Sequence, residues 1–349
     1  MLAFAADAQK TTNGKPAVDL PKNIILMIGD GMGLAEVYAA YTANHQQLNI
    51  TQCDQVALVT TFSADNYITD SGASGTALAC GSKTTNGKIG MDPDGKPLTS
   101  ILKLAEKKGL STGMATTCDI THATPAAFIA SVKSRKDKYD IALQFLDTDI
   151  DVFIGGGLNN FNKRPDSVNL TDSLKSRGYE VITTLDNLKN AQSRKIAGLL
   201  YPAHPPKMSD GRGEMLPVAV EKALDILSKN NDGFFLMVEG SQIDWGGHDN
   251  NIDYIISETL DFDKAVKAAL NFARDNGETL VIITADHETG GLANLEGDFT
   301  LGTAGGKFTT TDHSAIPVPL YATGPGSKEF KGFIDNTDVF KIMKRLLDL

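Results

Sequence analysis

The sequence is poor in cysteine. Its three cysteines, Cys53, Cys80 and Cys118, lie far apart and form no C-x-x-C pair. Neither a zinc knuckle nor a dense disulfide framework is therefore expected. We expect all three cysteines to be small buried residues, although the sequence leaves one disulfide open.

Long hydrophobic runs and an excess of positive charge are also absent. No apolar run in the 349 residues reaches the length of a transmembrane helix, which argues against a membrane-spanning protein. The formal net charge of −10 argues against a nucleic-acid or anionic-membrane partner. An anionic substrate would need a local source of attraction, and bound cations are the obvious candidate.

Internal repeats, low-complexity tracts and linkers are absent as well, so we expect residues 21–349 to form a single domain. Residues 1–20 begin with a short apolar run and small alanines, with an Ala-x-Ala element at residues 6–8, and then turn polar. This pattern is typical of the remnant of a secretory signal, with a flexible tail as the alternative. It predicts a periplasmic or secreted protein.

Strand and helix patterns alternate along the chain. This alternation predicts an α/β fold, a three-layer sandwich whose central, largely parallel sheet is flanked by helices. Residues 158–212 are the least regular part, and we expect surface loops there, with His204 exposed and without a role. The expected strands are residues 23–28, 56–62, 113–118, 151–154, 179–183, 234–238, 279–284 and 318–323, and the expected helices include residues 98–108, 214–228, 252–274 and 335–349.

Three of the strongest strands end on a carboxylate. Asp30, Glu239 and Asp286 each follow a buried strand, and a parallel sheet gathers such strand ends at one edge, where ligands bind. Asp30 lies in the stretch GDGMG, whose glycine spacing does not fit a dinucleotide fingerprint. A strand-end acid can also be a helix cap, but three such acids together favour a binding site.

Histidines stand close to these acids in the sequence. Asp244 and His248 are four residues apart, His287 follows Asp286, and His313 lies further on. Histidine mixed with carboxylates suits zinc, whereas carboxylates with hydroxyls suit magnesium. Each pair alone is common on protein surfaces, but their coincidence at the strand ends predicts a metal centre.

The stretch ITDSGASGTALACGSK, at residues 68–83, predicts a loop that turns into a helix at Asp70 and Ser71. Free N–H groups and the helix dipole favour an anion at such a point. For an isolated Asp-Ser pair the ordinary interpretation is that Ser71 is a helix N-cap. A serine acts as a nucleophile only where a base or a metal activates it.

Six stretches together resemble the alkaline phosphatases. They occur in that family's order over residues 22–326: NIILMIGDGMG, TDSGASGTALACGSKTTNGKIG, THATPAAF with VKSRK, MVEGSQIDWGGH, TADHETGG and DHSAIPVPLYATGP. The resemblance implies hydrolysis of phosphate monoesters at alkaline pH. In that reaction Ser71 would become phosphoserine and Arg135 would clamp two phosphate oxygens.

The resemblance also implies three metal ions. One Zn²⁺ would be held by Asp244, His248 and His313, and a second by Asp30, Asp286 and His287. A third ion, usually Mg²⁺, would be bound by Thr124 and Glu239, with Asp30 as a bridge. Two close cations suit phosphoryl transfer, which needs positioning and charge neutralisation.

Two positions depart from the best-known enterobacterial member. This chain has His122 and Trp245 where that enzyme carries Asp and Lys. His122 puts the identity of the third metal in question and lets Zn²⁺ replace Mg²⁺. Trp245 lacks the charge of a lysine, so we expect weaker phosphate retention. Asp70, next to the nucleophile, is expected in the substrate-binding shell, and the family implies a homodimer.

Two alternatives stay open. The nearest is a sister hydrolase, namely a phosphodiesterase, a phosphonate hydrolase or a cofactor-independent mutase. Arg135 and the third site favour monoesters over these, because an additional ester group would compete for their space. The other alternative is a metal- or phosphate-binding protein without turnover, which would have no need of Ser71.

Overall fold

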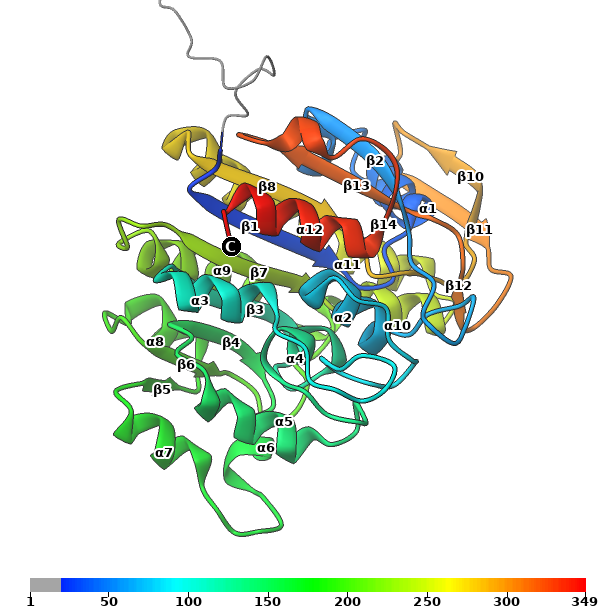
Figure 1. Cartoon of the computed structure of the whole chain (residues 1–349). Coiled ribbons are helices and arrows are strands. Elements are labelled where there is room, and N and C mark those ends of the chain that lie inside the picture. Colours follow the sequence, from blue (N-terminus) through cyan, green and yellow to red (C-terminus); the bar gives the residue numbers. More distant parts are fainter. Residues whose placement is uncertain (1–19) are drawn as a thin grey trace, which may run out of the picture.

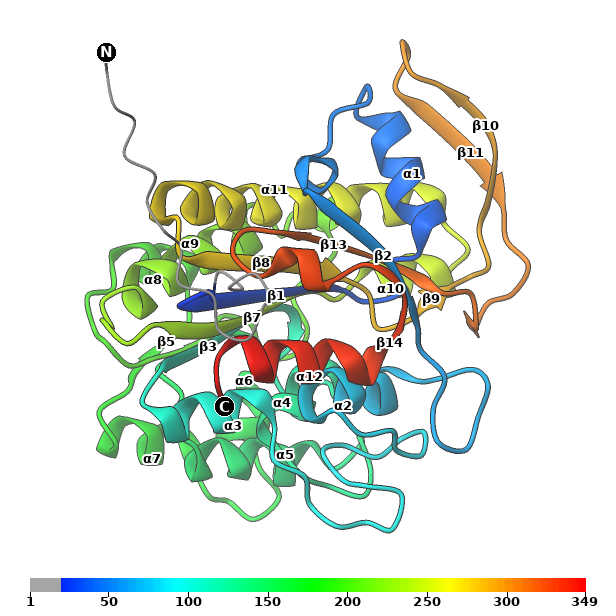
Figure 2. The same cartoon turned by 45° about the horizontal axis from the view of Figure 1, so that its top comes forward.

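The computed structural model describes residues 20–349 (Figure 1). The N-terminal segment with the predicted signal remnant lies outside the described residues, apart from its last residue. A ten-stranded sheet runs through the molecule and helices cover both faces (Figure 2), which confirms the predicted three-layer α/β fold. Across the sheet the strands are β14 (Gly332–Asp335), β2 (Gln55–Thr60), β13 (Val318–Thr323), β8 (Thr279–Thr284), β1 (Asn23–Gly29), β7 (Phe234–Gly240), β3 (Ser111–Asp119), β4 (Val152–Gly156), β6 (Ile196–Leu199) and β5 (Glu180–Ile182).

The sheet is largely parallel, as predicted. Strand β13 runs antiparallel to its neighbours β8 and β2, while the other paired strands run parallel. The three central strands β7, β1 and β8 are buried along their whole length. This explains their continuous apolar sequences, because a parallel strand covered on both faces has no solvated side to alternate with.

The helices form two layers, one on each face of the sheet (Figure 2). One layer consists of α2 (Ser71–Cys80), α3 (Ile101–Lys108), α4 (Ala123–Ile129), α5 (Lys138–Gln144), α6 (Leu158–Asn162), α7 (Leu170–Ser176) and α12 (Asn336–Leu346). The other consists of α1 (Leu34–Ala43), α8 (Leu185–Asn190), α9 (Met215–Leu227), α10 (Ile243–His248) and α11 (Ile252–Asn276). Outside the main sheet lie a hairpin of β10 (Ala293–Asp298) and β11 (Thr303–Lys307), and a short pair of β9 (Glu288–Thr289) and β12 (His313–Ser314).

Local signals in the sequence explain where the long helix α11 begins and ends. The side chain of Asn251 accepts a hydrogen bond from the backbone N–H of Tyr254, which satisfies one of the free donors of the first turn. Gly277 follows the last turn with φ of +74°, a left-handed conformation that glycine adopts without steric cost. The sequence therefore fixes both ends to within a few residues.

The structure confirms the strand expected at residues 179–183, which is β5, but the expectation of surface loops over the rest of residues 158–212 is wrong. This region contains α6, α7, β5, α8 and β6. Strand β6 is fully buried and pairs with both β4 and β5. Its four residues, IAGL, are too few to show a periodicity, and their strand conformation depends on neighbours that are distant in sequence.

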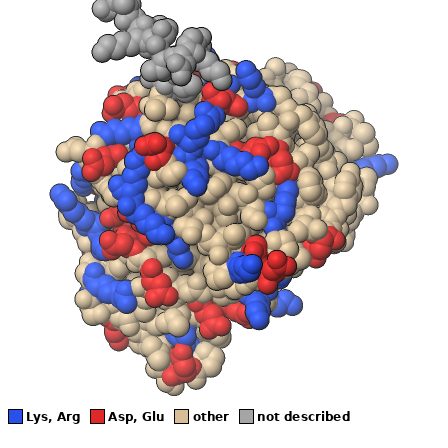
Figure 3. All heavy atoms as spheres, in the orientation of Figure 1, with Lys and Arg blue, Asp and Glu red and all other residues tan. Residues whose placement is uncertain are grey.

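The surface carries charges of both signs. On the face that includes α3 and α12, lysines and arginines lie beside acidic side chains (Figure 3), for example in the pairs Lys108–Asp348 and Arg345–Glu329. None of the helices in residues 20–349 combines the length and the apolar character that a bilayer crossing requires.

A buried ion-pair cluster connects helix α11 with the segment that precedes α9. Arg212 is fully buried and donates hydrogen bonds to Glu258 and, at 2.8 Å, to Asp261. Glu258 also accepts a hydrogen bond from the backbone N–H of Met208. Because two buried carboxylates share one guanidinium, removal of the cation leaves uncompensated negative charge in the interior.

We therefore predict that Arg212→Met lowers the free energy of unfolding by about 3–5 kcal/mol, measured by urea denaturation. The matched control is Arg274→Met, which removes an exposed arginine paired with exposed Asp275 and is expected to cost less than about 1 kcal/mol. Neutralising both carboxylates in the Arg212→Met background, with Glu258→Gln and Asp261→Asn, should recover part of the loss. Equal losses for the two single variants would contradict this account.

Candidate metal centre and active site

The three strand-end carboxylates lie together, as the sequence predicts. Strands β7, β1 and β8 are adjacent and parallel, and Ile28 of β1 is in register with both Glu239 of β7 and Thr284 of β8. Asp30 follows directly after β1 and Asp286 lies two residues after the end of β8, where it accepts a hydrogen bond from the backbone N–H of Gly31 at 3.2 Å. The sheet therefore brings the three acids to one edge.

These carboxylates are fully buried, and several of their oxygens lack a hydrogen-bond partner. Both oxygens of Asp30, one of Asp286 and one of Glu239 have none. Burial, together with the neighbouring acids, raises the pKa of Asp30, and burial raises the pKa values of Asp286 and Glu239 to about 7. Because buried carboxylates without partners are costly, the cluster is a site for cations.

One predicted ligand set assembles between α10 and β12. Ligand atoms of Asp244, His248 and His313 all lie within 4.8 Å of one another. The Nδ1 atoms of His248 and His313 lie 2.7 and 2.8 Å from the carbonyl oxygens of Thr311 and Thr69. These carbonyls accept the Nδ1 proton, and each Nε2 faces Asp244, at 3.3 Å for His248 and 3.5 Å for His313, so that Nε2 is the atom each ring offers to a metal, as metal-ligating histidines favour.

The second predicted set lies beside it. The Nε2 atom of His287 is 3.5 Å from Asp30 and 3.3 Å from Asp286. Burial lowers the pKa of His287 well below its ordinary value, so the ring is a neutral donor. Asp244 also reaches this group, since its ligand atom lies within 4.8 Å of those of Asp30 and His287. The two sets therefore form one continuous centre that suits two cations.

Ser71 is the first residue of α2, and the helix cap is Asp70. The Asp70 carboxylate accepts a hydrogen bond from the backbone N–H of Ala73 at 2.9 Å, so the interpretation of Ser71 as the N-cap is wrong. The Ser71 hydroxyl is thereby free of capping, and its Oγ lies 3.3 Å from Nε2 of His287. The helix thus presents a buried hydroxyl to the second ligand set.

Arg135 stands next to the same helix start. Its Nη1 donates to the Asp70 carboxylate at 2.9 Å, and its backbone N–H donates to the carbonyl oxygen of Gly87. The same carboxylate oxygen also accepts from the backbone N–H of Gly87. Asp70 therefore ties the cap of α2, the turn at Gly87 and the guanidinium together, which orients Arg135 beside Ser71.

A third group of donors lies at the ends of β3 and β7. It contains the predicted residues Thr124, His122 and Glu239, and burial lowers the pKa of His122 to about 3. Ligand atoms of Cys118, His122 and Glu239 lie within 4.8 Å of one another. From the sequence, Cys118 is expected only to be a small buried residue. Its position at the end of a strand, four residues before His122, is the feature of the sequence that could have indicated a candidate ligand.

The expectation that His204 is exposed is wrong. Its ring is half-buried, with its centroid 4.9 Å from that of Trp245 and 5.6 Å from that of His122. Its Nδ1 accepts a hydrogen bond from the backbone N–H of Asp119 at 3.1 Å. The segment folds over the strand ends because Gly157, after β4, donates its N–H to a carbonyl of this segment.

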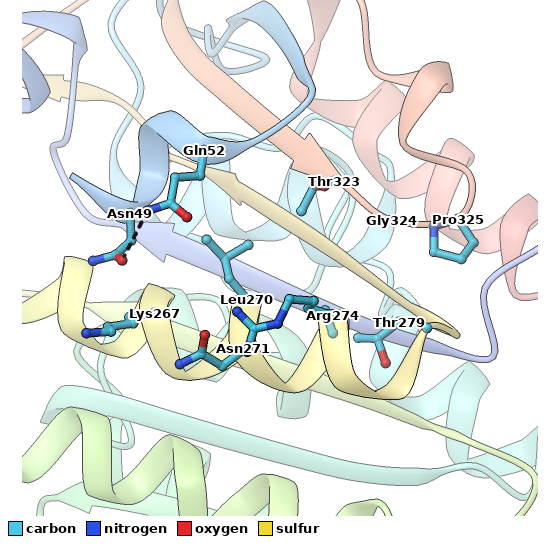
Figure 4. Close-up of a pocket in the computed structure, with 12 residues that line it drawn as sticks. Asn49, Gln52, Lys267, Leu270, Asn271, Arg274, Thr279, Thr323, Gly324 and Pro325 are labelled. Atoms are coloured by element: carbon cyan, nitrogen blue, oxygen red, sulfur yellow. Dashed lines mark hydrogen bonds between the residues drawn. The ribbon is translucent and has the colours of Figure 1, made fainter. Parts of the chain in front are cut away.

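A groove elsewhere on the surface does not belong to this centre. It lies between α11, residues 49–52 and the loop after β13, and Asn49, Lys267, Arg274 and Thr323 are among its lining residues (Figure 4). Thr279, at the start of β8, also lines it, so the groove is at the opposite end of this strand from Asp286. It contains none of the candidate ligands.

The profile of the alkaline phosphatases matches residues 21–304. The chain belongs to the alkaline phosphatase family. Alkaline phosphatase 4 of Bacillus subtilis (strain 168) is 36% identical over 93% of this chain and 89% of its own length. The alkaline phosphatase of the Antarctic bacterium TAB5 is 40% identical over 94% of this chain and 99% of its own, with a TM-score of 0.90.

A TAB5 variant is also similar. In that variant aspartate replaces a histidine and Mg is bound in the M3 site; it is 39% identical over 95% of this chain and 99% of its own, with a TM-score of 0.89. Alkaline phosphatases are metal-dependent phosphomonoester hydrolases, and the buried carboxylate oxygens of this chain that lack hydrogen-bond partners fit that requirement.

We predict that metal removal destabilises this alkaline phosphatase, because it exposes the mutual repulsion of the strand-end carboxylates. Chelation should lower the melting temperature by about 5 °C or more relative to saturating Zn²⁺, measured by differential scanning fluorimetry. Asp30→Asn should raise the melting temperature of the chelated protein and reduce the increment that Zn²⁺ restores. A melting temperature unaffected by chelation in the native chain would contradict the assignment.

Proposed function

We propose that this phosphomonoester hydrolase works through a phosphoserine formed on Ser71. The observation that carries the proposal is the position of Ser71, whose buried Oγ lies at the start of α2, 3.3 Å from His287. Arg135 is held by Asp70, the residue directly before Ser71. A dianionic phosphoryl group would therefore meet a nucleophile, a helix N-terminus and a guanidinium together.

Two steps account for the chemistry. Ser71 Oγ attacks phosphorus and the alcohol leaves with its oxygen; water then attacks the phosphoserine, which releases phosphate and restores the hydroxyl. Throughout, the planar guanidinium of Arg135 donates to two non-bridging oxygens and keeps the phosphoryl group aligned. Bound cations supply Lewis-acid stabilisation for the entering and leaving oxygens and lower the pKa of the attacking hydroxyl or water.

The metal assignment follows the ligand sets. We propose that Asp244, His248 and His313 hold one Zn²⁺, and that Asp30, Asp286 and His287 hold the other. Thr124 and Glu239 belong to a third site, for which the magnesium bound in the M3 site of the TAB5 variant is a parallel. Support for three sites comes from the groups of ligand atoms and from the buried oxygens without partners.

We predict that Ser71→Ala lowers kcat for p-nitrophenyl phosphate at alkaline pH by at least about 10³-fold, while Zn²⁺ content stays unchanged. The matched control is Ser82→Ala, just beyond the end of α2, which should keep full activity. Acid quenching of the native enzyme should trap phosphate on the peptide that contains Ser71. Full activity of Ser71→Ala would mean that water attacks phosphorus directly.

A sister hydrolase remains the specific competitor. Arg135 favours the dianion of a monoester over a diester, because the second ester group would remove one of the oxygens that its two donors require. Turnover of bis(p-nitrophenyl) phosphate above that of the monoester would place the protein among phosphodiesterases. Stoichiometric phosphate uptake without alcohol release would instead indicate a binding protein.

We expect Trp245 to determine how tightly the enzyme retains the phosphate product. Its indole packs edge-on against His122 and His204 and carries no charge to hold the product. We predict that Trp245→Lys lowers the inhibition constant for inorganic phosphate about tenfold, the effect of a charged hydrogen bond of roughly 1.5 kcal/mol. Trp245→Phe should leave the constant close to that of the native enzyme. An unchanged constant for the lysine variant would exclude this role.

The last points concern the protein's location and its oligomeric state. We propose a periplasmic or secreted homodimer that acts on small phosphate monoesters, supported by the apolar, alanine-containing start of the chain and by the family's usual assembly. The mass of the purified protein by light scattering and its recovery in a periplasmic extract test these two points.

A further inference from the structure

Cys118 lies where the third metal is expected. It is the penultimate residue of β3, its side chain is fully buried, and its Sγ lies 3.3 Å from Oε2 of Glu239. Its sulfur, a ring nitrogen of His122 and a carboxylate oxygen of Glu239 all lie within 4.8 Å of one another. A sulfur, a nitrogen and an oxygen donor therefore face a common point.

The donors around this point lack partners of their own. Nδ1 of His122, Oε1 of Glu239 and Oγ1 of Thr124 are all buried without a hydrogen bond, and Glu239 and Thr124 are completely inaccessible to solvent. Unpartnered polar atoms this deep in a protein are costly. Three unpartnered polar atoms near one thiol indicate that this group of side chains binds an ion.

The chemistry of the donor set distinguishes between the candidate ions. Mg²⁺ requires oxygen ligands in near-octahedral geometry, whereas sulfur and imidazole nitrogen favour Zn²⁺. Two of the donors here, Cys118 and His122, are of the kinds that Mg²⁺ disfavours. A tetrahedral ion would accept the sulfur, the nitrogen and the carboxylate and keep one further position for the hydroxyl of Thr124 or for water.

We propose that Cys118 is a thiolate ligand of the third metal site and that the site selects Zn²⁺ over Mg²⁺. The inference rests on the proposed function for the existence of a third site. On binding, the sulfur–hydrogen bond of Cys118 breaks, a sulfur–metal bond forms, and the proton passes to solvent. Without a metal, the thiol lies within hydrogen-bond distance of two acceptors, the carbonyl oxygen of Asp119 at 3.2 Å and Oε2 of Glu239 at 3.3 Å, which keep the sulfur in place.

The other two cysteines provide matched controls. The sulfur of Cys80 faces the carbonyl oxygen of Ala127 at 3.9 Å, and Cys53 is only half-buried. Neither of them contributes to a group of candidate metal ligands in the part of the chain that the structure describes. Thiolate coordination therefore has to come from Cys118, and Cys53→Ser and Cys80→Ser should leave it intact.

The test is the absorption spectrum of the full chain after chelation and reloading with Co²⁺. We expect a near-ultraviolet thiolate-to-cobalt charge-transfer band, absent in Cys118→Ser and retained in both control variants. In mixtures of Zn²⁺ and Mg²⁺, metal analysis should find Zn²⁺ in the third site of the native chain. The affinity of that site for Zn²⁺ should fall at least about tenfold in Cys118→Ser.

A native chain without the band, or a band that persists in Cys118→Ser, overturns the proposal. Cadmium NMR of the native protein gives the same answer without a variant, because a thiolate ligand shifts the cadmium resonance strongly downfield; its absence is equally decisive. The outcome is separable from the proposed function. An inactive protein with the band would retain the thiolate site, whereas an active enzyme without it would retain only the phosphatase mechanism.

Discussion

Mutual repulsion among buried carboxylates is the constraint on which the site depends. Asp30, Glu239 and Asp286 are brought together by the pairing of three central strands, and no described side chain neutralises all their oxygens. The continuous apolar core beneath these strands contributes the stability that tolerates such an arrangement. Cations relieve this electrostatic repulsion, which the order of the strands creates. Metal binding and folding are therefore energetically linked.

Around this centre, hydrogen bonds fix the direction of several functional side chains. Backbone carbonyls of Thr69 and Thr311 fix the rings of His313 and His248, and Asp70 holds both the helix start and Arg135. The net charge of −10 is therefore no obstacle to a dianionic substrate. In the proposed mechanism the attraction would be local and would come from cations held at the strand ends, from the helix end and from the guanidinium.

Most of the architecture could be predicted because its signals are local. Strands β8 and β13 begin and end at the predicted residues, and the strand-end acids follow from the general geometry of parallel sheets. The failures share one physical origin. The strand conformation of β6 and the half-buried position of His204 depend on contacts outside their own stretches, with β4 and β5 and with Gly157 after β4. Cys118 is buried as predicted, but its contact with Glu239 joins residues that are distant in sequence. Hydrophobic periodicity and motif spacing describe only neighbouring residues, so they do not predict such long-range contacts.

The antiparallel strand β13 has a consequence for how the chain folds. Early in the sequence, β2 pairs only with β13 and β14, which lie near the other end of the described chain. During synthesis, β2 therefore stays unpaired until almost all of the remaining chain has left the ribosome. That long-range closure is entropically slow. An unpaired β2, with half-exposed Val56 and Leu58, is the segment a chaperone would have to shield meanwhile.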